Sequence, residues 1–388
     1  MDKDNVAFNF DDIRPVNNDE VKDAIEELIA NEDLVRAIGY IKPNLNWEEF
    51  SEVMRSCKTK EEFKARMAYD AVMTIAKATT FSLTVSGKSR LPKDNAPCTF
   101  ISNHRDIILD ASFLNVILYD VGYGMTQVAI GDNLLIRSWI KTLVSLNNSF
   151  IVKRGVGVRQ MLEVSGKLSA YIHHTIKETK ESVWIAQREG RAKDSDDRTQ
   201  NSILKMFNIA GKEGNILDNI ISLNIVPVSI SYEFDPCDFL KAKEFQQKRD
   251  DEAFVKTQRD DLLNMETGIL NNKGRVHFTI CSPINDALVK LDRDMDKNEI
   301  YSAIANIIDR EIFKHYRFYP HNYVAFDILN NTRRFNEHYS FNDKKKFEEY
   351  LKGQLDKIVI PNKDEAFLKS KILEMYSNPL KNQIENQD

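Results

Sequence analysis

A histidine followed by two aspartates stands out early in the sequence. His104 comes just after the apolar run 98–101 and just before Asp106 and Asp110. The run predicts a strand that leads into a polar turn and an apolar helix, which places His104 at a strand's carboxyl end, where open α/β sheets bind ligands. A nearby carboxylate orients an imidazole and increases its basicity. The pattern predicts a general base, and the alternative is a polar turn in which Asp106 caps the helix.

Charged and glycine residues follow two further apolar runs. Lys153 and Arg154 end the run 150–152, and Glu189, Gly190 and Arg191 come shortly after the run 183–186. An arginine fork suits phosphate or carboxylate, and a glycine lets the backbone approach a substrate closely. These residues predict a binding site for an anionic substrate. The alternatives are a solvated strand end and a glycine turn with a charged rim.

These stretches together resemble the motifs of the glycerolipid acyltransferase superfamily, which includes glycerol-3-phosphate and 1-acylglycerol-3-phosphate acyltransferases. Asn103-His104-Arg105 followed by Asp110 resembles the first motif, in which a His and an Asp form the catalytic pair. Three later stretches follow in the family's order and resemble the second, third and fourth motifs: residues 150–154, 183–191 and 225–229. The resemblance covers about residues 97–232.

Two of these motifs depart from the family's pattern. Five residues separate His104 from Asp110, one more than is usual in the family, and one residue separates His104 from Asp106. We favour Asp110 as the partner, because Asp106 has a competing role as helix cap. In the third motif Arg188 replaces the usual proline. The Thr-Arg pair is shortened, so that Arg191 corresponds either to the Thr or to the Arg of that pair.

The resemblance implies an O-acyltransferase in which His104 is the general base and Asp110 orients it. The implied donor is acyl-coenzyme A or acyl carrier protein, and the acceptor is a hydroxyl of glycerol-3-phosphate, a lysophospholipid or another lyso-lipid. Backbone N–H groups after His104 are expected to stabilise the oxyanion. The residues implied for substrate binding are Lys153, Arg154, Glu189, Gly190, Arg191 and, near the acyl donor, Pro227. Neither a metal nor a redox cofactor is expected.

Two other functions stay open. A non-catalytic lipid-binding protein at a membrane surface would keep the fold and bind lipid without turnover. A hydrolase would use the same histidine to activate water and release free fatty acid without an acceptor. We rank the hydrolase last, because the chain lacks a Gly-x-Ser-x-Gly nucleophile motif.

The elements that must position these residues predict an α/β fold with a mixed central sheet flanked by helices. The expected strands are 98–101, 127–130, 150–152, 183–186, 225–232 and 276–281. Helical patterns before about residue 80, with capping residues at Asn46 and Thr59, predict an N-terminal helical bundle. We expect three parts: an N-terminal helical region (1–86), an α/β acyltransferase domain (87–294) and a C-terminal helical extension (295–388).

Two segments within this fold have more than one interpretation. By itself, Pro227 marks a sheet edge or a bulge. Residues 133–146 form a basic amphipathic stretch, which either packs on the sheet or lies in a membrane interface.

Composition narrows the class of protein. With 388 residues, 42% hydrophobic and 29% charged, the chain is long enough for a large globular core. The net charge of -5 gives no general basic field, so nucleic acid is not an expected partner. The four cysteines have no short spacing and are expected to be free thiols.

The location follows from what the sequence lacks. The first residues are acidic, without the basic and apolar segments of a signal peptide, and no apolar stretch of about 18 residues occurs. We therefore expect a cytoplasmic protein, either free or peripheral on the inner face of the cell membrane.

Overall fold

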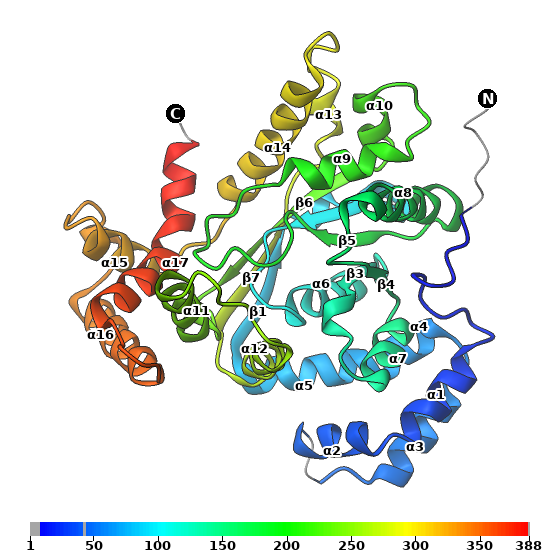
Figure 1. Cartoon of the computed structure of the whole chain (residues 1–388), viewed down its shortest axis with the longest axis horizontal. Coiled ribbons are helices and arrows are strands. Elements are labelled where there is room, and N and C mark those ends of the chain that lie inside the picture. Colours follow the sequence, from blue (N-terminus) through cyan, green and yellow to red (C-terminus); the bar gives the residue numbers. More distant parts are fainter. Residues whose placement is uncertain (1–7, 42–43, 387–388) are drawn as a thin grey trace.

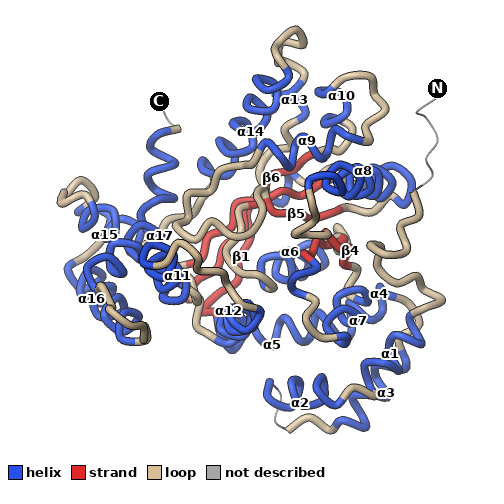
Figure 2. The backbone as a smooth tube through the Cα atoms, viewed as in Figure 1, coloured by secondary structure: helices blue, strands red, loops and turns tan. Residues whose placement is uncertain are grey.

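Seven strands form one mixed sheet at the centre of the computed structural model, which describes residues 8–41 and 44–386 (Figures 1 and 2). The strand order is β1-β7-β6-β2-β5-β3-β4, and only the β6–β7 pair is antiparallel among the described strands. Helices flank the sheet, which confirms the predicted fold class. The strands are β1 (Thr80–Ser86), β2 (Thr99–Ser102), β3 (Gln127–Gly131), β4 (Ser149–Val152), β5 (Val183–Ala186), β6 (Ile225–Tyr232) and β7 (Gly274–Ile280).

The first strand is the one that the sequence pattern did not predict. β1 directly follows a helix and pairs in parallel with β7 at the edge of the sheet. Its edge position leaves Phe81 mostly exposed, so β1 lacks the continuous apolar run that marked the buried strands. The expected division into three parts, which placed residues 80–86 in the helical region, remains a prediction.

Pro227 lies in the interior of the sheet rather than at an edge. β6 has β2 on one side and β7 on the other, and the carbonyl of Pro227 accepts a hydrogen bond from Cys281 N at 2.9 Å. The edge position that the proline suggested is therefore wrong.

Each face of the sheet is covered by its own apolar core. One face packs Ile101, Ile185 and Ile225 against α8, α9, α10, α13 and α14. The other packs Phe100, Trp184 and Val226 against α6 and α5 (Tyr69–Thr79). This alternation follows from the two-residue period of a strand. The flanking helices are α6 (Leu109–Asp120), α8 (Val158–His174), α9 (Asn201–Ile209), α10 (Ile216–Ile221), α12 (Gln258–Leu270), α13 (Asn285–Leu288) and α14 (Lys297–Lys314).

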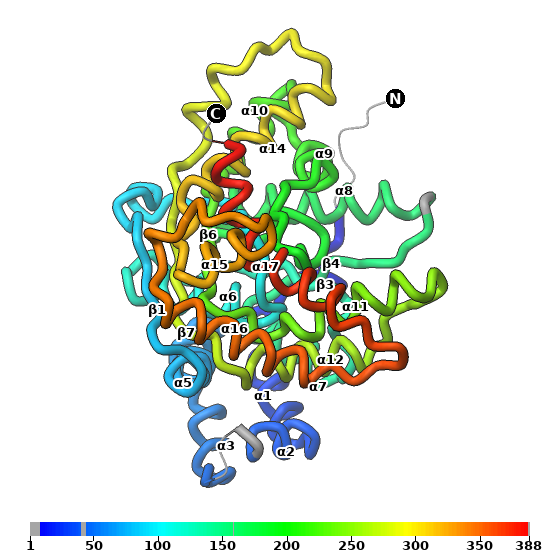
Figure 3. Tube along the Cα trace, turned by 90° about the vertical axis from the view of Figure 1, so that its left-hand side faces the viewer, coloured from blue at the N-terminus to red at the C-terminus, as the bar shows by residue number. Residues whose placement is uncertain are grey.

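The N-terminal helices form the predicted bundle at one end of the molecule (Figures 1 and 3). As expected, Asn46 caps α3 by accepting from Glu48 N and Glu49 N, and Thr59 caps α4 by accepting from Glu62 N. The bundle helices are α1 (Val21–Ile29), α2 (Glu32–Ile41), α3 (Trp47–Ser56), α4 (Lys60–Phe63) and α5 (Tyr69–Thr79).

The amphipathic stretch at 133–146 contributes α7 (Ser138–Leu146), which packs on this bundle. Leu146, with Trp139 and Leu143 beside it, belongs to the same apolar cluster as Val21 and Leu28 of α1. The apolar face of α7 is thus covered by protein.

The C-terminal helices form a separate apolar cluster with α11 (Asp238–Asp250). Figure 1 shows them beside the β1–β7 end of the sheet. They are α15 (Pro320–Leu329), α16 (Phe341–Asp356) and α17 (Glu365–Glu385). Every helix in the described part of the chain is too short or too polar to cross a membrane. All four cysteines are buried free thiols, as expected.

Candidate active site

The side chain of Asn103 extends the pairing of β2 with β6 beyond the last strand residue. Asn103 Nδ2 donates to Ile230 O at 2.9 Å, and Ile230 N donates to Asn103 Oδ1 at 2.8 Å. The amide replaces one unit of backbone pairing on a fully buried strand end. Consequently the chain leaves β2 in a fixed direction, and the next residue, His104, projects from the carboxyl edge of the sheet.

His104 is paired with Asp110, at the start of α6. Their Nδ1 and Oδ2 atoms lie 2.8 Å apart, and the same carboxylate oxygen accepts Arg105 N at 2.5 Å and Asp106 N at 3.0 Å. Because a carboxylate oxygen accepts, Nδ1 is the donor in this contact, and in the neutral imidazole Nε2 then keeps its lone pair. Nε2 has no hydrogen-bond partner among the described residues, so it is available as a base.

Asp106 is the helix cap, which is the alternative role that the sequence predicted for it. Its Oδ1 accepts from Ile108 N at 2.9 Å and from Leu109 N at 2.8 Å, which caps the start of α6. Burial, and then the nearby Asp110 carboxylate, raise the pKa of Asp106. Of the two aspartates, Asp110 therefore contacts the His104 ring and Asp106 holds the helix.

Four of the backbone N–H groups after His104, among which we expected the donors to an oxyanion, are already occupied. Those of Arg105 and Asp106 donate to Asp110, and those of Ile108 and Leu109 donate to Asp106. The expectation is wrong for these four groups, because they already donate hydrogen bonds to the two buried carboxylates.

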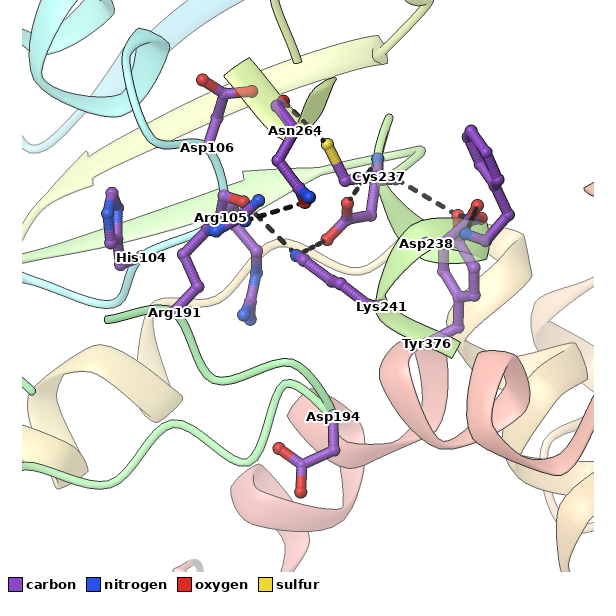
Figure 4. Close-up of polar contacts among 12 residues, drawn as sticks. His104, Arg105, Asp106, Arg191, Asp194, Cys237, Asp238, Lys241, Asn264 and Tyr376 are labelled. Carbon is purple, nitrogen blue, oxygen red and sulfur yellow. Dashed lines mark hydrogen bonds and ion pairs between the residues drawn. The ribbon is translucent and has the colours of Figure 1, made fainter. Parts of the chain in front are cut away.

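Arg105 anchors the turn that carries His104, residues 103–108. Its guanidinium forms a buried pair with Asp197, including an NH1–Oδ1 distance of 3.1 Å. Its carbonyl accepts from Lys241 Nζ at 3.3 Å (Figure 4). Lys241 also pairs with the buried Asp235. Sequence reasoning missed Asp197, Asp235 and Lys241, since ordinary charged residues in loops and helices carry no spacing signal.

His104 lines a cavity of about 1170 Å³ between the sheet edge and the N-terminal bundle. Its wall is largely apolar and comes from several helices as well as from the strand ends. Members of this wall include Leu34, Phe50, Met67, Ile75, Ile108, Leu143, Leu168 and Met265. The bundle therefore covers the edge of the sheet that carries His104.

Four of the six predicted substrate-binding residues line this cavity: Lys153, Arg154, Glu189 and Gly190. Lys153 Nζ pairs with Asp12 at 2.5 Å, and Arg154 NH1 pairs with Glu189 Oε1 at 3.2 Å. Gly190 has a φ of 67°, a left-handed conformation that favours glycine in the turn after β5. These residues lie together at the carboxyl ends of β4 and β5.

Arg191 and Pro227 do not belong to the described residues that line the cavity. Arg191 is half-buried, and its NH2 donates to Asn264 Oδ1 of α12 at 2.9 Å. In Figure 4 the His104 ring lies apart from this contact. Arg191 thus holds α12 against the loop after β5, and Pro227 is buried within the sheet.

A group of potential metal ligands lies at the opposite edge of the sheet. Cys281, Glu311 and His315 each place one ligand atom within 4.8 Å of the others. Cys281 follows β7 next to the start of β6, since Ile280 pairs with Val228. His104 is at the other end of the sheet, so this group is separate from the cavity.

Comparisons with known proteins add one distant similarity. No family model matches the sequence, and no curated protein matches it. One matching solved structure is the crystal structure of the 1-acyl-sn-glycerophosphate (LPA) acyltransferase PlsC from Thermotoga maritima. That match has 13% sequence identity and a TM-score of 0.34, and it covers 77% of this chain and 97% of that chain. At this identity and TM-score the match gives no basis for assigning an activity to this chain.

Proposed function

We propose that this chain is an O-acyltransferase that moves a fatty acyl group from a thioester to a hydroxyl of a lyso-lipid or of glycerol-3-phosphate. One observation carries the proposal. His104 is bound through Nδ1 to the buried Asp110, while its Nε2 is unpartnered among the described residues, and the ring lines a large, mostly apolar cavity. A base of this kind beside an apolar cavity suits proton abstraction from a lipid hydroxyl.

The proposed reaction is a direct transfer. His104 Nε2 takes the proton of the acceptor hydroxyl as its oxygen attacks the thioester carbonyl carbon. The new C–O bond forms, the C–S bond breaks, and the imidazolium returns its proton to the departing thiolate. Asp110 holds the imidazole in the reactive tautomer and stabilises the imidazolium, so no acyl-enzyme is required.

The cavity wall suggests how the substrates are held. The apolar residues from α5, α7 and α12 suit an acyl chain, and the charged residues at the ends of β4 and β5 suit a polar head group. Acyl-coenzyme A and acyl carrier protein are the proposed donors. We also propose that a lipid substrate is taken up at a membrane surface.

The test is acyl transfer by the purified full chain. Acyl-coenzyme A or acyl carrier protein would be offered with a panel of lyso-lipids and glycerol-3-phosphate, and the products identified by mass spectrometry. We expect one acylated product from the wild type, and its loss in His104→Ala and Asp110→Asn. His174→Ala, which removes an exposed histidine of α8, is the matched control and should keep the activity.

The outcomes separate the three functions. Full activity of His104→Ala would overturn the mechanism. Release of free fatty acid by the wild type without an acceptor would identify a hydrolase. Lipid binding without any turnover, unchanged by His104→Ala, would identify a non-catalytic lipid-binding protein.

A further inference from the structure

Three side chains that suit a metal ion come together where β7 and α14 end. Cys281 directly follows β7, Glu311 lies near the end of α14, and His315 is the residue after that helix. Each offers one ligand atom, and the three atoms lie within 4.8 Å of one another. The fold thus brings a thiol, a carboxylate and an imidazole to one point, although Cys281 is distant from the other two in the sequence.

Two of these groups already have nearly the spacing of metal ligands. Glu311 and His315 are four residues apart, which places them on one face of a helical turn. His315 Nδ1 lies 3.7 Å from Glu311 Oε2. Ligand atoms around a tetrahedral zinc ion are about 3.3–3.6 Å apart, because the bonds to zinc are about 2.0–2.3 Å long. The Cys281 sulfur lies within 4.8 Å of a ligand atom of each residue, so it would have to approach by about 1 Å at most.

Contacts with the backbone hold the two helical ligands and leave them able to bind an ion. Ser282 N donates to Glu311 Oε2 at 3.2 Å, a contact that orients the carboxylate as hydrogen bonds behind metal ligands do. His315 Nδ1 lies 2.9 Å from Glu311 O, so a proton on Nδ1 leaves the lone pair of Nε2 for an ion. With the proton on Nε2 instead, Nδ1 becomes the ligand. The imidazole is a possible ligand in either tautomer.

The Cys281 thiol is buried and only weakly bonded. Its Sγ donates to Thr279 O at 3.6 Å and to Glu311 O at 3.5 Å. Burial, and then the Glu311 carboxylate, raise the pKa of this thiol, so it is neutral without an ion. A bound cation reverses this preference, because it coordinates the thiolate and releases the proton.

The charge around the three groups favours a cation. A helix places partial negative charge at its carboxyl end, and α14 is 18 residues long and ends at Lys314. Glu311 adds a full negative charge at the same place. Of the cations nearby, Arg90 donates through NH1 to Ile280 O at 3.0 Å, and Lys314 is exposed.

We propose that Cys281, Glu311 and His315 bind one Zn²⁺ ion, which joins the end of β7 to the end of α14. Sulfur and nitrogen ligands favour zinc over Mg²⁺ and Ca²⁺, which prefer oxygen. As the Zn–S bond forms, the thiol proton leaves to solvent. The side chains of Glu311 and His315 are 22% and 15% exposed, so water can take the fourth position on the ion. Because this site lies at the end of the sheet away from His104, the proposal is independent of the proposed acyl transfer.

The experiment measures metal binding by the purified full chain after a chelator has removed bound ions. Zn²⁺ would be titrated by calorimetry, and Co²⁺ would serve as an optical probe, because a Co²⁺–thiolate bond gives an ultraviolet charge-transfer band. The variants are Cys281→Ser, Glu311→Gln and His315→Gln. Cys57→Ser is the matched control, because Cys57 is also a buried thiol whose Sγ donates to a backbone carbonyl at 3.5 Å.

We expect the wild type to bind one Zn²⁺ ion and to show the Co²⁺–thiolate band. Each of the three variants should bind Zn²⁺ at least about 100-fold more weakly, since loss of even an outer partner of a metal ligand costs about 10- to 100-fold. Cys57→Ser should bind like the wild type. No Zn²⁺ binding by the wild type, or equal binding by the wild type and all three variants, would overturn the proposal.

Thermal unfolding gives a second test that does not depend on the buried cysteine variant. Glu311→Gln and His315→Gln change partly exposed side chains, so they decide the question even where Cys281→Ser does not fold. Saturating Zn²⁺ should raise the Tm of the wild type and of Cys57→Ser, because the ion binds the folded chain. It should leave the Tm of Glu311→Gln and His315→Gln unchanged. An equal rise in these two variants would reject the site.

Discussion

The close approach of α12 to the turn that carries His104 means that Gly268→Ala should disturb the candidate site. A Cβ built on Gly268 would overlap Asp106 Oδ2 and would lie 3.0 Å from its Cγ. The Asp106 carboxylate is buried and caps α6, so it has no open space to move into without losing its bonds to Ile108 N and Leu109 N. The substitution should therefore displace the turn that carries His104.

The expected change in the free energy of unfolding combines two unfavourable effects and one favourable effect. Overpacking a filled site costs about 1–3 kcal/mol, and losing a helix cap costs about 0.5–2 kcal/mol. Replacing a glycine inside a helix by alanine returns about 1 kcal/mol. We expect a net loss of about 2 kcal/mol in the free energy of unfolding. A shift of the His104 ring by even about 1 Å should lower the rate of acyl transfer by roughly 100-fold.

The assay is denaturant unfolding followed by circular dichroism, together with the rate of acyl transfer. Gly166→Ala in α8 is the matched control, because its added Cβ would meet only Ile209 Cγ2 at 3.6 Å, an ordinary contact. The control should be neutral or slightly stabilising and fully active. If Gly268→Ala behaved like Gly166→Ala in both measurements, the proposed coupling of α12 to the turn that carries His104 would be refuted.

Two further predictions concern the buried residues Lys241 and Asp309. Lys241→Met leaves the Asp235 carboxylate unpaired and removes the donor to the Arg105 carbonyl, so denaturant unfolding should show a loss of about 3–5 kcal/mol; an unchanged midpoint would contradict this role. Burial raises the pKa of Asp309, on α14, to about 7 despite its hydrogen bonds from Thr199. The folded pKa of Asp309 lies above its unfolded value, so the wild type should lose stability relative to Asp309→Asn as the pH rises from about 4 to about 7. The loss in the free energy of unfolding should be at most about 1.4 kcal/mol for each pH unit. Parallel stability curves over that range would rule this out.

Much of the sheet was predictable because its strands are buried on both faces. Such strands give short apolar runs, and the runs at 98–101 and 225–232 correspond to β2 and β6 almost residue for residue. β1 was missed because an edge strand with polar residues on one face has no such run. Its partner β7 lies almost 200 residues away in the chain, beyond the reach of any local pattern.

Of the candidate site, the sequence could predict only the residues that follow directly after strands. The sequence could bring His104, Arg154 and Glu189 together because each follows a buried strand, and parallel strands bring their carboxyl ends to one edge. The direction of a side chain after the strand is decided by its contacts. Arg191 turns to Asn264 of α12, whereas Arg188, three residues earlier, lines the cavity. No local pattern distinguishes these two arginines.

The central claim is that His104 is the general base of an acyl transfer, and its most direct test is the kcat/KM of His104→Ala on whichever acceptor the wild type acylates. Removing a positioned general base should lower kcat/KM by about 100- to 10,000-fold with the fold intact by circular dichroism. A folded His104→Ala variant with wild-type kcat/KM would contradict the account.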